Sequence, residues 1–101
     1  MTNSLWVVHC LDAPGAAAAR ELARPAHSAR LRASTTRPAC YGPLVGEDGR
    51  TPVGSLIVLW AADRAEVERW VAEDPFTTAG VWGEVRVHAF AQSANSPNPL
   101  T

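Results

Sequence analysis

Three features of the sequence predict an α+β fold. Four short apolar segments resemble strands, two longer segments have helical spacing, and they follow one another as strand, helix, strand, strand, helix, strand. This βαββαβ order is typical of the ferredoxin-like arrangement, a four-stranded antiparallel sheet with helices on one face. The other face of such a sheet needs a cover, and a second copy of the chain would supply it.

The first strand and the first helix occupy the first third of the chain. Leu5 to Leu11 is apolar and partly β-branched, which predicts a largely buried strand. Gly15 to Ala33 is rich in Ala and Arg, which are strong helix formers. Pro25 falls inside this segment, so either the helix kinks there or a second helix begins with Pro25 in its first turn. Residues at helical spacing that we expect to face the core are Leu22, Ala26, Ala29 and Ala33.

A hairpin is predicted in the middle of the chain. Pro38 to Leu44 has the character of a short edge strand, because Pro is tolerated at strand starts and edges. Val53 to Trp60 is the strongest strand candidate, and the turn cluster at residues 46–49 would join the two strands.

The second helix and the last strand follow. Asp63 to Glu73 has an apolar stripe behind a capping-box pattern in which Asp63 is the N-cap, and Pro75 ends this segment. Val81 to Phe90 alternates as a strand with one buried face does. In this alternation one face of the strand carries Val81, Gly83, Val85, Val87 and Ala89, and the other carries Trp82, Glu84, Arg86, His88 and Phe90.

Length and composition indicate one ordinary domain, which we expect over residues 1–92, with a flexible tail at 93–101 that is rich in Ser, Asn and Pro. The formal net charge is −1 and no basic stripe is present, so nucleic acid is not an expected partner. No apolar run approaches the ~20 residues of a membrane span, and no signal-peptide pattern opens the chain. We therefore expect a cytoplasmic protein without a membrane partner, in which Cys10 and Cys40 are free thiols.

One imidazole and one carboxylate stand out as candidates for chemistry. Asp74 lies at a chain reversal directly before Pro75, and His27 lies on the first predicted helix. If the fold brings them together, the carboxylate would orient the imidazole and make it a general base. The alternatives are that Asp74 only caps a short helix and that His27 is an ordinary helix histidine.

Several further residues have both a binding and a structural interpretation. Trp60, Phe76 and Trp82 would suit a flat ligand in an aromatic pocket, or would pack at a dimer interface. Ser55 offers a hydroxyl on a central strand, and Arg24 offers a cation one helical turn from His27; either could equally serve packing or solvation.

No cofactor or metal is predicted. His9 and His88 lack clustered ligand spacing and an acidic partner, so they do not indicate a metal site. The glycine-rich nucleotide loops, the serine-hydrolase elbow and the zinc-protease motif do not occur in the sequence.

Four segments in order resemble the YciI-like (YCII-related) family of the dimeric α/β-barrel superfamily. They are Arg24-Pro25-Ala26-His27 with Leu31, Gly42-Pro43-Leu44 before Asp48-Gly49, Pro52-Val53-Gly54-Ser55-Leu56, and Asp74-Pro75-Phe76 with Ala79-Gly80-Val81. Together they span roughly residues 5 to 91. Two positions depart from the family pattern: Ser28 stands where an apolar residue is usual, and Tyr41 stands where a small residue is common.

The resemblance implies a ferredoxin-like protomer, a homodimer and an active site built from His27 and Asp74. It suggests a cofactor-independent lyase, dehydrochlorinase or isomerase that acts on a small aromatic or lactone-like compound. The alternatives are a non-catalytic small-molecule-binding or dimeric interaction module, and a cofactorless monooxygenase of the same fold.

Overall fold

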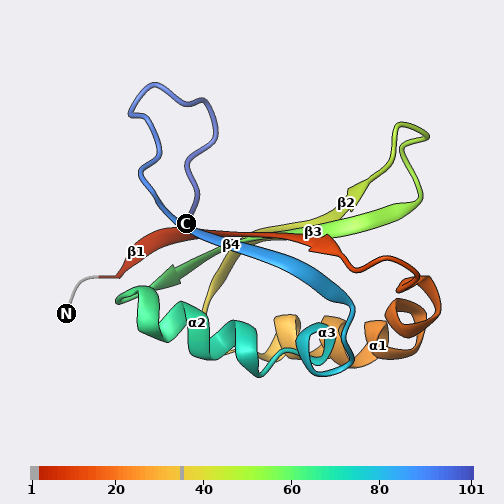
Figure 1. Cartoon of the computed structure of the whole chain (residues 1–101). Helices are drawn as coiled ribbons and strands as arrows, with labels where there is room; N and C mark the ends of the chain where they lie inside the picture. The colour runs from red at the N-terminus through yellow and green to blue at the C-terminus, as the bar shows by residue number, and fades with distance from the viewer. Residues whose placement is uncertain (1–2, 35) are drawn as a thin grey trace.

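The computed structural model describes residues 3–34 and 36–101 and contains an antiparallel sheet with helices on one face (Figure 1). The strands are β1 (Ser4–Asp12), β2 (Pro38–Val45), β3 (Pro52–Ala61) and β4 (Trp82–Phe90), and the helices are α1 (Ala17–Ala33), α2 (Arg64–Ala72) and α3 (Pro75–Thr78). The strands lie in the order β2-β3-β1-β4. The predicted ferredoxin-like α+β fold is confirmed, and Pro38–Val45 is an edge strand as expected.

Local sequence signals account for the helix boundaries. The Asp63 side chain accepts a hydrogen bond from the Glu66 amide at 2.9 Å, so Asp63 is the N-cap of α2 as predicted. Pro75 ends α2 and stands in the first turn of α3, whose N-cap is Asp74. Pro25 lies inside α1, which continues as one helix to Ala33. The alternative of a second helix beginning at Pro25 is therefore wrong.

Strand register divides the sheet into a helix-covered face and an open face. Successive side chains alternate between the faces, and directly paired residues share one. Val8 pairs with Ile57 on one side and Val87 on the other, and these three side chains pack in the core beneath the helices. The open face carries the alternate residues, including Leu5, Val7, Leu11, Leu56, Val58, Trp60, His88 and Phe90.

The buried stripe of α1 differs from the one predicted from its apolar residues. Leu22 is 86% exposed, and Ala26, Ala29 and Ala33 are exposed as well. The residues that α1 buries are Arg20, His27 and Leu31, at spacings of seven and four. The prediction assumed an apolar stripe, but two polar side chains can be buried here because carboxylates and carbonyls on other elements bind them.

A β-bulge redirects Trp82. Leu11 pairs with Glu84 whereas Asp12 pairs with Trp82, so β4 has one extra residue at Gly83. A side chain at Gly83 would collide with Ala13, since a Cβ there would lie 2.8 Å from the Ala13 Cα. The simple alternation predicted for Val81 to Phe90 is therefore wrong at its start, and Trp82 points into the core rather than to the side of Glu84.

The end of the chain contains no further helix or strand. The Gln92 side chain donates hydrogen bonds to the Ser96 hydroxyl and the Asn98 carbonyl and accepts one from the Leu100 amide. These contacts hold residues 92–100 in a loop on the open-face side of the sheet (Figure 1). The start of the predicted domain 1–92 lies outside the described residues. Within the part of the chain that is described, no helix has the length and apolarity needed to cross a membrane.

Close approach of β1 and β3 requires glycine at position 54. A Cβ at Gly54 would overlap the carbonyl oxygen of Cys10 and approach the Leu44 side chain at 3.1 Å. We expect Gly54→Ala to lower the free energy of unfolding by about 3 kcal/mol, because backbone must move to admit the methyl group. Gly42→Ala is the matched control, since nothing lies within 4 Å of its Cβ position. Equal urea-unfolding midpoints for the two variants would contradict this packing.

Candidate functional site

The fold brings His27 of α1 into direct contact with Asp74. The His27 Nδ1 atom lies 2.7 Å from Asp74 Oδ1. An ionised carboxylate only accepts hydrogen bonds, so the neutral imidazole carries its proton on Nδ1 and has its lone pair on Nε2. The His27 ring stacks on Phe76 with a centroid distance of 4.0 Å and meets the edge of Trp82 at 5.8 Å. The ring is therefore fixed by one hydrogen bond and two aromatic neighbours.

Asp74 is completely buried, and its carboxylate also caps α3. Oδ1 accepts a second hydrogen bond from the Phe76 amide at 2.9 Å, which makes Asp74 the N-cap. Helix capping and contact with His27 were alternative interpretations of the sequence, and this residue does both. The short helix thus fixes the carboxylate that orients the imidazole.

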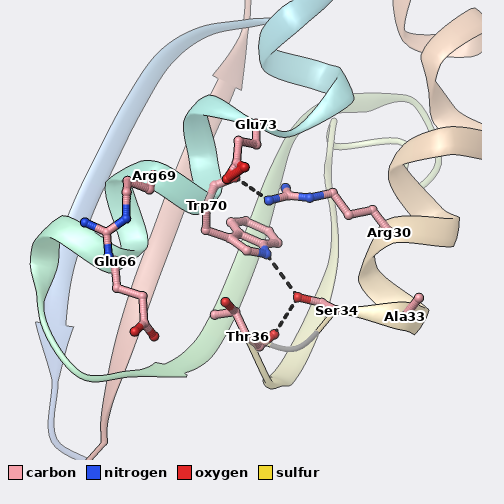
Figure 2. A pocket seen from close by; sticks show the side chains of 8 residues that line it. All are labelled: Arg30, Ala33, Ser34, Thr36, Glu66, Arg69, Trp70 and Glu73. Carbon is pink, nitrogen blue, oxygen red and sulfur yellow. Dashed lines mark hydrogen bonds between the residues drawn. The ribbon is translucent and has the colours of Figure 1, made fainter.

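Arg30 completes the environment of the buried carboxylate. Its Nη1 donates to Asp74 Oδ2 at 2.9 Å, and its Nη2 donates to the Trp70 carbonyl at 2.7 Å. The guanidinium carbon lies 4.4 Å from the Trp70 ring centroid, and the Trp70 indole N–H donates to the Ser34 hydroxyl (Figure 2). Both oxygens of Asp74 are thereby hydrogen-bonded inside the protein, as a buried charge requires.

A second buried ion pair stands on the same face of α1. Arg20 Nη1 lies 2.8 Å from both carboxylate oxygens of Asp12, and Nη2 donates to the Gly54 carbonyl and the Ser55 hydroxyl oxygen. The Trp82 indole N–H also donates to Ser55 Oγ, at 3.1 Å. Because Ser55 Oγ accepts from two donors, its own hydroxyl proton remains available to another acceptor.

These groups border one cavity of about 260 Å³ between α1, the β2–β3 hairpin and α3. From α1 its lining residues are Arg20, Arg24, His27, Ser28 and Leu31. From the strands and α3 they include Tyr41, Pro43, Ser55, Ile57 and Phe76. The cavity is mostly apolar and has its charged and polar groups at a few points, which is the usual character of a small-molecule site. Ser28 and Tyr41, which the sequence resemblance marked as departures from the usual family residues, both line it.

The predicted site residues are distributed unevenly around this cavity. His27, Ser55 and Phe76 line it, and Arg24 stands at its edge in an exposed ion pair with Glu21. Trp82 is buried behind the wall, where it contacts His27 and Ser55.

Trp60 does not join the others, because strand parity places residues 55, 57 and 59 beneath the helices and residue 60 on the open face. The Arg37 guanidinium carbon lies 5.6 Å from its ring centroid.

Three charged residues of the site, Arg20, Arg30 and Asp12, were not identified from the sequence. Arg20, His27 and Arg30 are spaced by seven and three residues, so they share a helix face, but the Ala and Leu residues of α1 offered an apparent apolar stripe instead. Asp12 looked like part of a strand-ending turn, although a carboxylate at that point can reach the start of the next helix. The repeated basic residues along one face were the available signal.

A larger hollow of about 390 Å³ lies on the other side of Arg30, between the end of α1 and α2 (Figure 2). Its lining is mainly charged and polar, with Glu66, Arg69 and Glu73 beside Arg30, and it includes neither His27 nor Asp74. Within residues 3–34 and 36–101, no three His, Cys, Asp or Glu side chains gather as metal ligands would. We therefore take the smaller cavity as the candidate site.

Comparison with known proteins identifies the family. The sequence model of the YCII-related domain family matches residues 4–91 of this chain. The chain belongs to the YCII-related family. The family resemblance seen in the four sequence segments is confirmed.

Two solved structures share this architecture. The dehydrochlorinase of 5-chloro-2-hydroxyhydroquinone from Burkholderia phenoliruptrix AC1100, in complex with 2,5-dihydroxybenzoquinone, is 28% identical and superposes with a TM-score of 0.80 over 88% of this chain and 95% of that one. PA3566 from Pseudomonas aeruginosa is 19% identical, with a TM-score of 0.55 over 93% and 97% of the two chains, and supports the fold alone.

A curated relative matches part of the sequence. The xenovulene A biosynthesis cluster protein asL2 of Sarocladium schorii is 43% identical over a 49-residue alignment, and the match covers 41% of this chain and 42% of that protein. The match therefore covers less than half of that relative.

Cys10 of β1 is fully buried in the core, near the carboxylates of Asp74 and Asp12. Burial, followed by the charges of Asp74 and Asp12, raises the pKa of the Cys10 thiol to about 12. The thiolate is the reactive form, so the native thiol should be inert at neutral pH. In a Cys40→Ser variant we expect no modification by iodoacetamide at pH 8 in the native state and one modified thiol per chain after unfolding in guanidinium, measured by mass spectrometry. Rapid labelling of the folded variant would contradict the placement of Cys10.

Proposed function

We propose that this protein is a small cofactor-independent enzyme that uses His27 and Asp74 for general acid–base chemistry. The observation that carries the proposal is the 2.7 Å contact between His27 Nδ1 and a buried carboxylate, at the wall of a cavity. This arrangement directs the lone pair of the other ring nitrogen to serve as a base and supplies a countercharge for the imidazolium that forms.

The proposed reaction begins with proton transfer from an activated hydroxyl or enol of the substrate to His27 Nε2. The proton and the imidazole form an imidazolium that stays hydrogen-bonded to Asp74, and the substrate keeps the electron pair as an oxyanion. In an elimination from a hydroxylated chloroaromatic, the imidazolium first returns the proton to the ring carbon that carries chlorine, which gives a keto tautomer. His27 Nε2 then accepts the proton of a second hydroxyl, the electron pair of that oxygen forms a carbonyl and expels chloride, and a quinone remains. In an isomerisation, the imidazolium returns the proton to a different substrate atom.

Arg20 and Ser55 are suited to stabilise the oxyanion. The guanidinium of Arg20 and the hydroxyl of Ser55 both line the cavity, and Asp12 holds Arg20 in a fixed position. Donors that are already oriented when negative charge develops lower the barrier without reorganising. Asp12 and Trp82 act through these two residues and have positioning roles in the proposal.

A small, flat, oxygenated ring fits this site best. The cavity of about 260 Å³ has Phe76 and Ile57 as apolar walls, and its polar groups can each meet a ring oxygen. The structural neighbour bound to 2,5-dihydroxybenzoquinone acts on a compound of that shape. We therefore place the substrate among hydroxylated aromatics or lactones, with a dehydrochlorinase-like lyase as the first reaction class. The cytoplasmic location expected from the sequence remains a prediction.

Removal of the imidazole should abolish most of the proposed activity. With 5-chloro-2-hydroxyhydroquinone as probe, we expect wild-type protein to release chloride and His27→Gln to reduce kcat/KM by about 10²–10⁴-fold, the range typical of a lost general base. Asp74→Asn should reduce the rate as well, since it removes the charge that stabilises the imidazolium. Chloride release measured by ion chromatography, with circular dichroism to verify folding, checks both variants.

Full turnover by folded His27→Gln would refute the dyad. The same assay separates the other functions considered for this fold. Binding of 2,5-dihydroxybenzoquinone by calorimetry without conversion of any halogenated or lactone probe indicates a binding module. Oxygen consumption during turnover indicates a cofactorless monooxygenase.

We also propose that the protein is a homodimer in which two open sheet faces pack together. That face presents apolar side chains with no helix over them, of which Leu11 and Phe90 are 39% and 41% exposed and Val7, Leu56 and Trp60 are half-buried. A sheet face of this kind is normally covered by a second layer. A second copy supplies that layer by two-fold symmetry.

Charge placed in the middle of the open face should separate the subunits. We expect wild-type protein to sediment at twice the 10.8 kDa chain mass and Leu56→Asp to sediment as a monomer, because an unpaired carboxylate would be buried in the interface. Leu22→Asp on the exposed side of α1 is the matched control and should remain dimeric. A dimeric Leu56→Asp protein would indicate that another surface forms the contact.

A further inference from the structure

Arg30 is the member of the site that neither the dyad nor the cavity accounts for. Its side chain is 22% exposed, yet its guanidinium reaches the fully buried carboxylate of Asp74. We propose that Arg30 is a positioning residue: it balances the charge of Asp74 permanently, so that His27 remains an uncharged base at neutral pH. This inference rests on the proposed acid–base function and concerns the regulation of that same site.

The electrostatic problem arises from the burial of Asp74. A carboxylate away from water must have a positive partner, and in an isolated histidine–aspartate pair that partner would be the imidazolium. Such a pair holds its proton tightly, and a protonated His27 cannot accept a proton from a substrate. Arg30 changes this because its charge is present at every pH at which the protein is folded. With Oδ2 bound to Arg30, Oδ1 needs only a neutral N–H donor.

Other groups near His27 do not replace Arg30 in this role. Those that face the imidazole or Asp74 are Arg20, Arg24 and Arg30 from α1, Asp12 and Cys10 from β1, and Tyr41 from β2. Glu66 and Arg69 of α2, and Glu73 after it, border the hollow on the other side of Arg30 and do not line the cavity of His27. The charge of Arg20 is balanced by Asp12, and Arg24 is exposed and paired with Glu21. Cys10 is uncharged at neutral pH because the pKa of its thiol is raised, and Tyr41 stands at the exposed rim of the cavity. Asp74 and Arg30 are therefore the charges that control the protonation of His27.

The surroundings of Arg30 hold it in place. Its second nitrogen donates to the Trp70 carbonyl, and its guanidinium stacks on the Trp70 ring, whose indole nitrogen is held by Ser34 (Figure 2). A planar guanidinium can meet a carboxylate oxygen, a carbonyl oxygen and an aromatic face at once. These contacts fix the cation against Asp74 although part of the side chain faces solvent.

The test is an NMR titration of the His27 ring, which needs no substrate. Resonances of the three histidines are followed against pH, and His27→Gln assigns the one of interest. In Arg30→Gln, which removes the charge but keeps amide donors, we expect the His27 midpoint to rise by about one pH unit. Arg30→Lys keeps the charge and should stay within a few tenths of a unit of wild type. Arg24→Gln makes the same change in net charge at an exposed position of the same helix and should leave the midpoint unchanged.

An unchanged midpoint in folded Arg30→Gln would overturn the inference. A rise in Arg30→Lys as large as that in Arg30→Gln would also overturn it, since it would assign the effect to geometry rather than charge. If Arg30→Gln does not fold, Arg30→Met, which keeps an aliphatic stem against Trp70, is the second charge-removing variant.

The same variants give a kinetic signature where turnover is measurable. A base works only when uncharged, so the rate falls as pH drops through the His27 midpoint, and this acid limb should move upward in Arg30→Gln but not in Arg30→Lys. Failure of His27→Gln to lose activity would refute the proposed enzyme while leaving the NMR result intact. Failure of the NMR shift alone would refute only the role of Arg30.

Discussion

Burial of the Asp74 carboxylate is the constraint on which the site depends. The side chain is fully buried, so its charge must be balanced and its oxygens hydrogen-bonded within the protein. His27 and Arg30 come from α1, while the Phe76 amide comes from α3. The carboxylate thereby ties two elements that are 44 to 47 residues apart in sequence. The geometry of the proposed base and the docking of α1 onto α3 are consequences of hydrogen bonds to the same two carboxylate oxygens.

The inner face of α1 pairs basic side chains with carboxylates of other elements at two points along the helix. Arg20, near the start of the helix, is paired with Asp12 of β1, and Arg30, near the end, is paired with Asp74. His27 stands between these two ion pairs and borders the cavity. A helix with an apolar inner stripe would pack as well, but it would present no charge to a ligand. The basic side chains of α1 beside the cavity can be buried because carboxylates of other elements pair with them.

The sequence predicted the order of the elements and the caps of both later helices, because each depends on local chemistry. It marked His27 and Asp74 as candidates for chemistry, but it did not show that the fold would bring them together. Asp63 and Asp74 cap helices through neighbouring amides, and strand alternation follows from backbone geometry. The features that the sequence did not reveal depend on partner residues that lie far away along the chain. The buried stripe of α1 was assigned to Leu22 and its apolar neighbours, because nothing within the helix shows that Arg20 meets Asp12 and Ser55. The position of Trp82 was likewise missed, since one extra residue in β4 reverses the side of the sheet.

In the proposed function, proton transfer and substrate selection would depend on different parts of the cavity. His27, Asp74, Arg20 and Ser55 are held by buried hydrogen bonds, so a change at any of them disturbs several contacts. Ser28 and Tyr41 also line the cavity, and Tyr41 is 47% exposed. The resemblance seen in the sequence marks both as departures from the usual residues of the family. A substitution at such a position alters the shape and polarity of the opening without displacing the imidazole or its carboxylate. In the proposed function, the imidazole and its carboxylate therefore supply the proton transfer, and the residues at the rim select the substrate.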